Sequence, residues 1–134
     1  MKNKTLIVKF QALNSFMDDG LSALKQGKIL VQPLNEIVFS DVGAYEKFMN
    51  PKKLHLLSAI KSLKPDSIYS LAKIVDRDFA NVFRDCGALE QHGFIKLDDL
   101  GDTRGSKKPV LSFDYDTIRV LLPTNISYSH MIAA

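Results

Sequence analysis

Arginine and asparagine side chains suited to hydrogen bonding with bases recur along a predicted helix over residues 78–92. Projected at about 100° per residue, Arg77, Asn81 and Arg84 fall on the same side of this helix. Arginine makes paired hydrogen bonds to guanine and asparagine makes them to adenine, while Ala88 on the same side allows close approach. The pattern predicts a helix that reads bases in a DNA groove, and a solvated polar face is the alternative.

Two aspartates accompany these polar residues. We expect Asp78, at the start of the helix, to cap free N–H groups or to orient Arg77. Asp85 is expected to form an ion pair with a neighbouring base-reading or core-flanking residue. The other side of the helix carries the predicted buried stripe, which consists of Phe79, Val82, Phe83, Cys86 and Leu89.

A shorter predicted helix precedes this one and holds it in place. It begins after Ser67, which is a good capping residue, and residues 76–78 form the turn between the two helices. Tyr69 and Ser70, exposed at its start, can donate hydrogen bonds to phosphate, although they are equally well explained as ordinary surface residues. Two helices at this spacing followed by a strand are typical of a winged helix-turn-helix.

The second helix ends at Gly93, and two predicted strands follow over residues 94–97 and 110–113. The loop between them, residues 98–108, carries two glycines and the basic side chains Arg104, Lys107 and Lys108. A flexible basic hairpin of this kind can reach the minor groove or flanking phosphates. Because the loop also contains three aspartates, an ordinary solvated hairpin is the alternative.

The remaining elements are expected on either side of this module. Apolar residues at helical spacing predict a helix over residues 6–27, interrupted near residues 18–20, and we expect it to form a dimer interface. A strand over 36–39, a short helix over 42–49 and a helix from Asn50-Pro51 to about residue 63 follow. A last strand is predicted over 118–122. The expected division is therefore an N-terminal dimerisation extension (1–49), a DNA-binding domain (50–123) and a tail (124–134).

Composition limits the classes of protein that fit. The chain has 134 residues, a formal net charge of +3 and one cysteine, Cys86, which predicts a globular protein from a reducing, cytoplasmic setting. No segment is predicted to span a membrane. His55, His92 and His130 are not spaced as metal ligands, and no phosphate-binding loop or activated nucleophile is recognisable. We therefore expect neither an enzyme nor a metal or cofactor site.

The order of these elements resembles that of winged helix-turn-helix transcription regulators of the MarR and ArsR type. The chain is more closely similar to a group of small prokaryotic predicted DNA-binding proteins with shared short motifs. In this sequence the motifs appear as Pro51-Lys52-Lys53-Leu54-His55-Leu56-Leu57, Arg77-Asp78, Asn81-Val82, Arg84-Asp85, Leu89-Glu90, Gly93-Phe94-Ile95 and Asp116-Thr117-Ile118. Arg119 departs from the pattern, which has a hydrophobic residue there, and Asp76 stands where many helix-turn-helix turns have glycine.

The resulting prediction is an α+β protein, a winged helix-turn-helix with an N-terminal helical and strand extension. We expect a homodimeric, sequence-specific regulator of transcription that binds double-stranded DNA. Helix 78–92 would read the major groove and loop 98–108 would contact flanking DNA. The alternative is a protein–protein adaptor or antitoxin-like partner with weak or no DNA binding.

Overall fold

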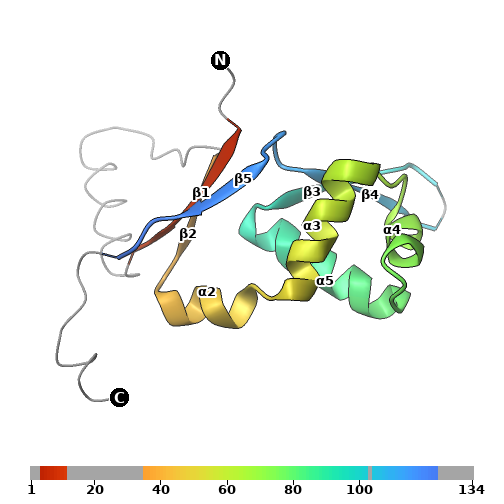
Figure 1. Ribbon diagram of the computed structural model, residues 1–134. Helices are drawn as coiled ribbons and strands as arrows, with labels where there is room; N and C mark the ends of the chain where they lie inside the picture. Colours follow the sequence, from red (N-terminus) through yellow and green to blue (C-terminus); the bar gives the residue numbers. More distant parts are fainter. Residues whose placement is uncertain (1–3, 12–34, 103, 124–134) are drawn as a thin grey trace, which may run out of the picture.

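The computed structural model describes residues 4–11, 35–102 and 104–123. A three-stranded parallel sheet has β1 (Thr5–Phe10) at its centre, between β2 (Glu36–Phe39) and β5 (Thr117–Val120). In this register Val8 lies opposite Ile37 on one side and Val120 on the other. The sheet lies beside the helices and a separate two-stranded hairpin (Figure 1).

The helix predicted over residues 6–27 is wrong for its first turn, which belongs to β1. Leu6 and Val8 are fully buried and alternate with the less buried Ile7 and Lys9, which is the period of a strand. The helical spacing came mostly from residues further along, and positions 12–34 lie outside the described residues. Phe10, which lies within that predicted helix, is the last residue of β1 and packs edge-to-face against Tyr45 with ring centroids 6.2 Å apart.

The predicted helix starts are confirmed by their caps. Helix α2 (Val42–Phe48) follows Asp41, α3 (Pro51–Leu63) follows Asn50, and α4 (Ile68–Ile74) follows Ser67, and each cap side chain accepts a backbone N–H bond. Helix α5 (Phe79–His92) ends at Gly93, whose φ of 91° is a conformation that glycine adopts without strain.

The strand that follows α5 pairs with the next strand in an antiparallel hairpin. Strand β3 (Ile95–Asp99) lies opposite β4 (Lys107–Leu111), so both strands extend further toward the loop than the sequence predicts. Strand β5, predicted over 118–122, ends at Val120 and pairs only with β1 among the described strands. Residues from both ends of the described chain therefore meet in one sheet.

One continuous core joins the sheet to the helices and the hairpin, which gives the described residues an α+β fold. Leu6, Val8, Ile37 and Phe39 of the sheet share this core with residues of α3, α4, α5 and β3. Its helical and hairpin members include Leu56, Ile60, Leu71, Val82, Cys86, Leu89, Phe94 and Ile95. In residues 4–11, 35–102 and 104–123, no helix is both long and apolar enough to cross a bilayer.

Candidate functional site

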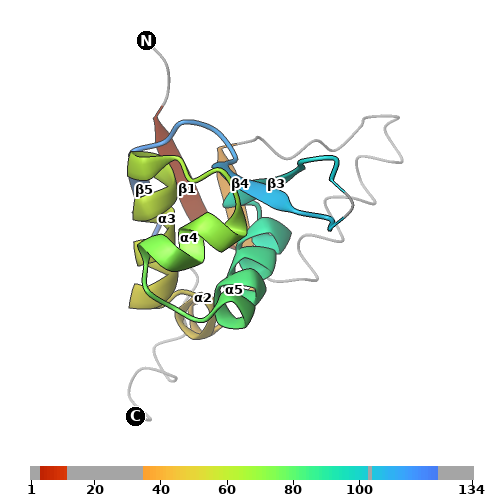
Figure 2. The same ribbon diagram turned by 90° about the vertical axis from the view of Figure 1, so that its right-hand side faces the viewer.

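Helices α4 and α5 are joined by a short turn whose backbone explains its sequence. Asp76 has a φ of 54°, the left-handed conformation for which glycine is usual and which aspartate tolerates better than most residues. The N–H of Arg77 then donates to the carbonyl oxygen of Ala72 at 3.0 Å, which closes the turn. Figure 2 shows the result: α5 lies next to α4 and below the β3–β4 hairpin.

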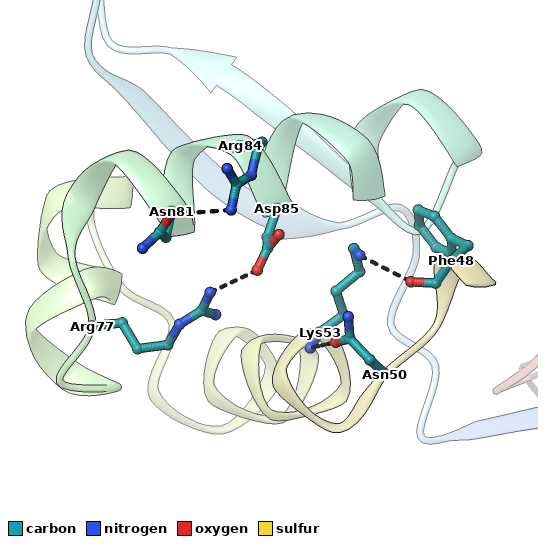
Figure 3. A network of polar contacts seen from close by, with 7 residues as sticks. All are labelled: Phe48, Asn50, Lys53, Arg77, Asn81, Arg84 and Asp85. Atoms are coloured by element: carbon teal, nitrogen blue, oxygen red, sulfur yellow. Dashed lines mark hydrogen bonds and ion pairs between the residues drawn. The ribbon is translucent and has the colours of Figure 1, made fainter. Parts of the chain in front are cut away.

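The core side of α5 fixes which side faces outward. Val82, Cys86 and Leu89 are completely buried. On the outward side Arg84 and Asn81 are both exposed, and Arg84 Nη2 donates to Asn81 Oδ1 at 3.0 Å (Figure 3). Among the described residues Arg84 has no carboxylate partner, so its charge is available to a ligand.

Arg77, the third predicted base-contacting residue, is placed differently. Its Nη2 donates to Asp85 Oδ2 at 2.8 Å, and the two side chains are only 19% and 14% exposed. The expected ion pair of Asp85 is therefore confirmed, and it fastens the turn to the second turn of α5. Asp78 occupies the N-cap position of α5 but makes no capping side-chain bond. Arg77 therefore has a structural role, because its ion pair with Asp85 connects the turn to α5.

A polar cleft lies between α5 and the beginning of α3. Lys53 Nζ donates to the Phe48 carbonyl oxygen at 2.9 Å and lies over the Phe48 ring, so this lysine is engaged within the fold (Figure 3). Lys52, which lines the cleft, is exposed. The cleft is lined by Asn50, Lys52, Arg77, Asp78, Asn81, Arg84 and Asp85.

The predicted buried stripe is wrong at two positions. Phe79 and Phe83 are 45% and 52% exposed, because they lie at the margin of the helix face that carries Val82 and Cys86. Together with Tyr69 of α4 they form a row of rings, with centroids 6.3 and 5.8 Å apart. We call the hollow beside this row the aromatic groove, and its lining consists of Ser67, Ile68, Tyr69, Phe79, Phe83, Arg104, Gly105, Ser106 and Lys107.

The three basic residues predicted at the hairpin separate onto two sides. Arg104 and Lys107 border the aromatic groove, next to α5. Lys108 follows Lys107 in the strand and its side chain therefore points the opposite way, into a hollow shared with Lys61 and Lys64. The structure thus brings two of the three close to α5.

The hairpin aspartates have structural partners within their own loop. Asp102 Oδ1 accepts the backbone N–H groups of Ser106 at 2.9 Å and Arg104 at 3.2 Å. Asp99 Oδ1 accepts the N–H of Gly101 at 2.8 Å, and its other oxygen lies 3.5 Å from Lys107 Nζ. These backbone bonds hold the pKa of both carboxyls below the usual range.

Tyr69 and Ser70 also differ from each other. Tyr69 is 58% exposed, and Lys73 Nζ lies 4.5 Å from the centre of its ring. Ser70 is half-buried, and its hydroxyl accepts a hydrogen bond from Ser67 Oγ at 3.2 Å within the cap of α4. Of the two, Tyr69 presents the larger free surface.

The buried titratable groups Cys86 and Tyr115 have raised pKa values and show no sign of an activated nucleophile. Burial, with a contribution from Asp85, raises the pKa of the Cys86 thiol to about 12, as for a small buried hydrophobic residue. Tyr115 is buried, its pKa is raised by desolvation, and its hydroxyl donates to the Phe94 carbonyl oxygen at 2.9 Å. Among the described residues there is no group of three or more His, Cys, Asp or Glu that could hold a metal ion.

Comparison with protein families gives one match. The model of the HVO_A0114 family matches residues 48–120, a stretch that contains α3, α4, α5 and the hairpin and makes up more than half of the chain. No curated protein and no solved structure matches the chain.

Proposed function

This chain belongs to the HVO_A0114 family, and we propose that it is a winged-helix protein that binds double-stranded DNA and regulates transcription. Helix α5 is the element that enters the major groove, with α4 behind it and the β3–β4 hairpin as the wing. The observation that carries this proposal is the exposed pair of Asn81 and Arg84 on the outward side of α5.

The outward side of α5 has the shape and chemistry that base contact requires. Ala80, Gly87 and Ala88 leave room for the helix to approach base edges, and a Cβ added at Gly87 would meet nothing within 4 Å. Arg84 supplies two parallel donors for guanine O6 and N7, and Asn81 supplies a donor and an acceptor for adenine. Since Asp85 is already paired with Arg77, its charge repels approaching phosphates less than a free carboxylate would.

The hairpin supports contact with the DNA backbone. Arg104 is exposed at its tip and Lys107 stands beside the groove next to α5. Asp102 and Asp99 order the loop by accepting its N–H groups, and this order fixes the positions of the two cations. Phosphate contacts of this kind set the register of a protein on DNA.

We further propose that the protein binds as a homodimer. A single winged module buries too little DNA surface for tight and selective binding, and two copies reading two half-sites overcome this limit. The apolar residues expected at the interface beyond Phe10 lie outside the described residues. Light scattering should report a dimer, and a monomer at micromolar concentration would contradict this part of the proposal.

The test of DNA binding is a fluorescence-anisotropy titration with duplexes enriched from a random library. Arg84→Ala and Asn81→Ala should each lower affinity for the selected duplex by about 1–3 kcal/mol and lower affinity for a scrambled duplex less. Arg104→Ala should weaken both duplexes similarly and reduce the log–log salt slope by about one per protomer. Arg119→Ala on β5 is the matched control, because Arg119 is exposed on the separate sheet.

Failure to enrich any duplex would reject this function, and equal binding by the wild type and all four variants would reject α5 and the hairpin as the surface that contacts DNA. The adaptor interpretation would then be tested by searching for a protein partner. Each variant is first checked by thermal unfolding, and Asn81, Arg84 and Arg104 are exposed, so their removal should leave the fold intact.

A further inference from the structure

Packing within the described residues does not account for the exposed rings of the aromatic groove. Tyr69, Phe79 and Phe83 each expose about half of their surface, 58%, 45% and 52%, although such side chains are usually drawn into a core. Their rings form a contiguous row. Exposed apolar surface gathered in one place, rather than scattered, is typical of a binding site.

The surroundings of the row indicate the charge of its ligand. Arg104 and Lys107 stand on the hairpin side of the groove, and Lys73 lies 4.5 Å from the Tyr69 ring centre. Asp99 lies 3.5 Å from Lys107 at the hairpin, but no acidic residue is among the described residues that line the groove. Apolar rings edged by cations fit a ligand that joins apolar groups to phosphates, as nucleic acid does.

The position of the row on α5 narrows the ligand further. Phe79 opens the helix and Phe83 lies one turn later, so both belong to the N-terminal half, which enters the major groove. Phe83 and Arg84 are neighbours in sequence and point to different margins of the outward side. Helix α5 therefore has a hydrogen-bonding margin with Asn81 and Arg84 and an apolar margin with the two phenylalanines.

An A·T base pair presents both kinds of group in the major groove. Adenine offers N6 and N7 to an asparagine, and thymine offers its 5-methyl group to an apolar side chain. Resting on the DNA-binding function proposed above, we propose that Phe79 and Phe83 recognise thymine methyl groups and so determine sequence specificity. The target sequence accordingly contains A·T pairs beneath the apolar margin of α5, and Arg104 and Lys107 hold the adjoining phosphates.

The experiment removes the methyl group alone. In the duplex enriched with the wild-type chain, each thymine is replaced in turn by deoxyuridine, which keeps the hydrogen-bonding pattern. The wild-type protein should lose about fourfold in affinity at one or two thymines of each half-site. This loss corresponds to the free energy of burying one methyl group. Phe83→Ala or Phe79→Ala should bind the thymine and deoxyuridine duplexes equally at the position that it contacts. Leu122→Ala, an 84% exposed apolar residue after β5, should keep the full penalty.

The outcomes separate this inference from the function on which it rests. A wild-type protein that binds its duplex tightly but is indifferent to every deoxyuridine overturns the inference and leaves DNA binding standing. Phenylalanine variants that retain the whole methyl penalty also overturn it. Tighter binding to the single strand than to the duplex overturns it as well, because the rings would then stack on unpaired bases. A wild-type protein that binds no duplex rejects the proposed function itself.

Discussion

Replacing Asp85 with alanine tests how much the Arg77–Asp85 ion pair, which connects the turn to α5, stabilises the fold. Complete removal of one partner from a buried ion pair costs about 3–5 kcal/mol, because the other charge stays behind without compensation. Arg77 and Asp85 retain 19% and 14% exposure, so solvent screens part of this cost. The Arg77 Nη1 atom is already buried without a partner among the described residues, which leaves the guanidinium with few other bonds. We expect Asp85→Ala to destabilise the protein by about 2 kcal/mol.

The measurement is urea and thermal unfolding followed by far-ultraviolet circular dichroism. For a domain of this size, about 2 kcal/mol lowers the midpoint of thermal unfolding by about 6–8 °C. Asp114→Ala is the matched control, since it removes an ion pair with Lys61 of 3.1 Å in which Asp114 is 81% exposed. Its midpoint should stay close to that of the wild type. The combined Arg77→Met and Asp85→Leu variant should recover much of the loss, because neither charge then remains.

Equal midpoints for Asp85→Ala and Asp114→Ala would refute this reasoning. Arg77 would then contribute nothing to the fold through Asp85, and its side chain would be free to contact DNA as the sequence predicts. A double variant as unstable as Asp85→Ala would show that the two side chains matter through packing instead of charge.

Three further predictions concern single residues. Cys86 is the chain's one cysteine and is fully buried with a pKa near 12, so a thiol reagent should label it at the rate of unfolding, and rapid labelling of the native protein would contradict this. Asp76 has a φ of 54°, so Asp76→Val should destabilise by about 1–2 kcal/mol while Asp76→Gly should be neutral or stabilising in urea unfolding. Burial and the Lys53 charge lower the pKa of His92, so the unfolded chain takes up this proton more readily than the folded protein. The free energy of unfolding should therefore fall as the pH drops below about 7 through about 6.5. His92→Phe keeps the stack on Phe39 and should flatten this part of the plot of unfolding free energy against pH. Parallel plots for the wild type and the variant would exclude His92 as the cause.

Local sequence signals predicted the helices around the candidate site accurately. Helix ends could be predicted from the caps Asn50 and Ser67 and from the terminal Gly93. Each of these residues acts on backbone groups that are close to it in the sequence. The same holds for the burial of Val82 and Cys86 in α5. The pairing of Arg77 with Asp85 was foreseeable because an acidic residue lies eight positions later, on the helix that follows the turn.

The failures concern long-range packing. Strand β1 is a strand because β2 and β5 lie on its two sides, and this arrangement cannot be seen within residues 5–10. Phe79 and Phe83 lie at the edge of the buried side of α5, where exposure depends on whether another element covers them. Alternation along β4 could have shown that Lys107 and Lys108 point apart, once the strand was known to begin at Lys107.

The pairing of β1 with β5 has a consequence for the order of assembly. Thr5 lies opposite Thr117, so this pair of strands closes a loop that contains every other described element. Closing so long a loop costs more chain entropy than forming the local contacts of α3, α4, α5 and the hairpin. Of the described elements, β1 is synthesised first and its second neighbour, β5, is synthesised last. The helices and the hairpin can therefore pack together before the sheet is complete. Pairing with β5 then converts β1 from an edge strand into the central strand of the sheet.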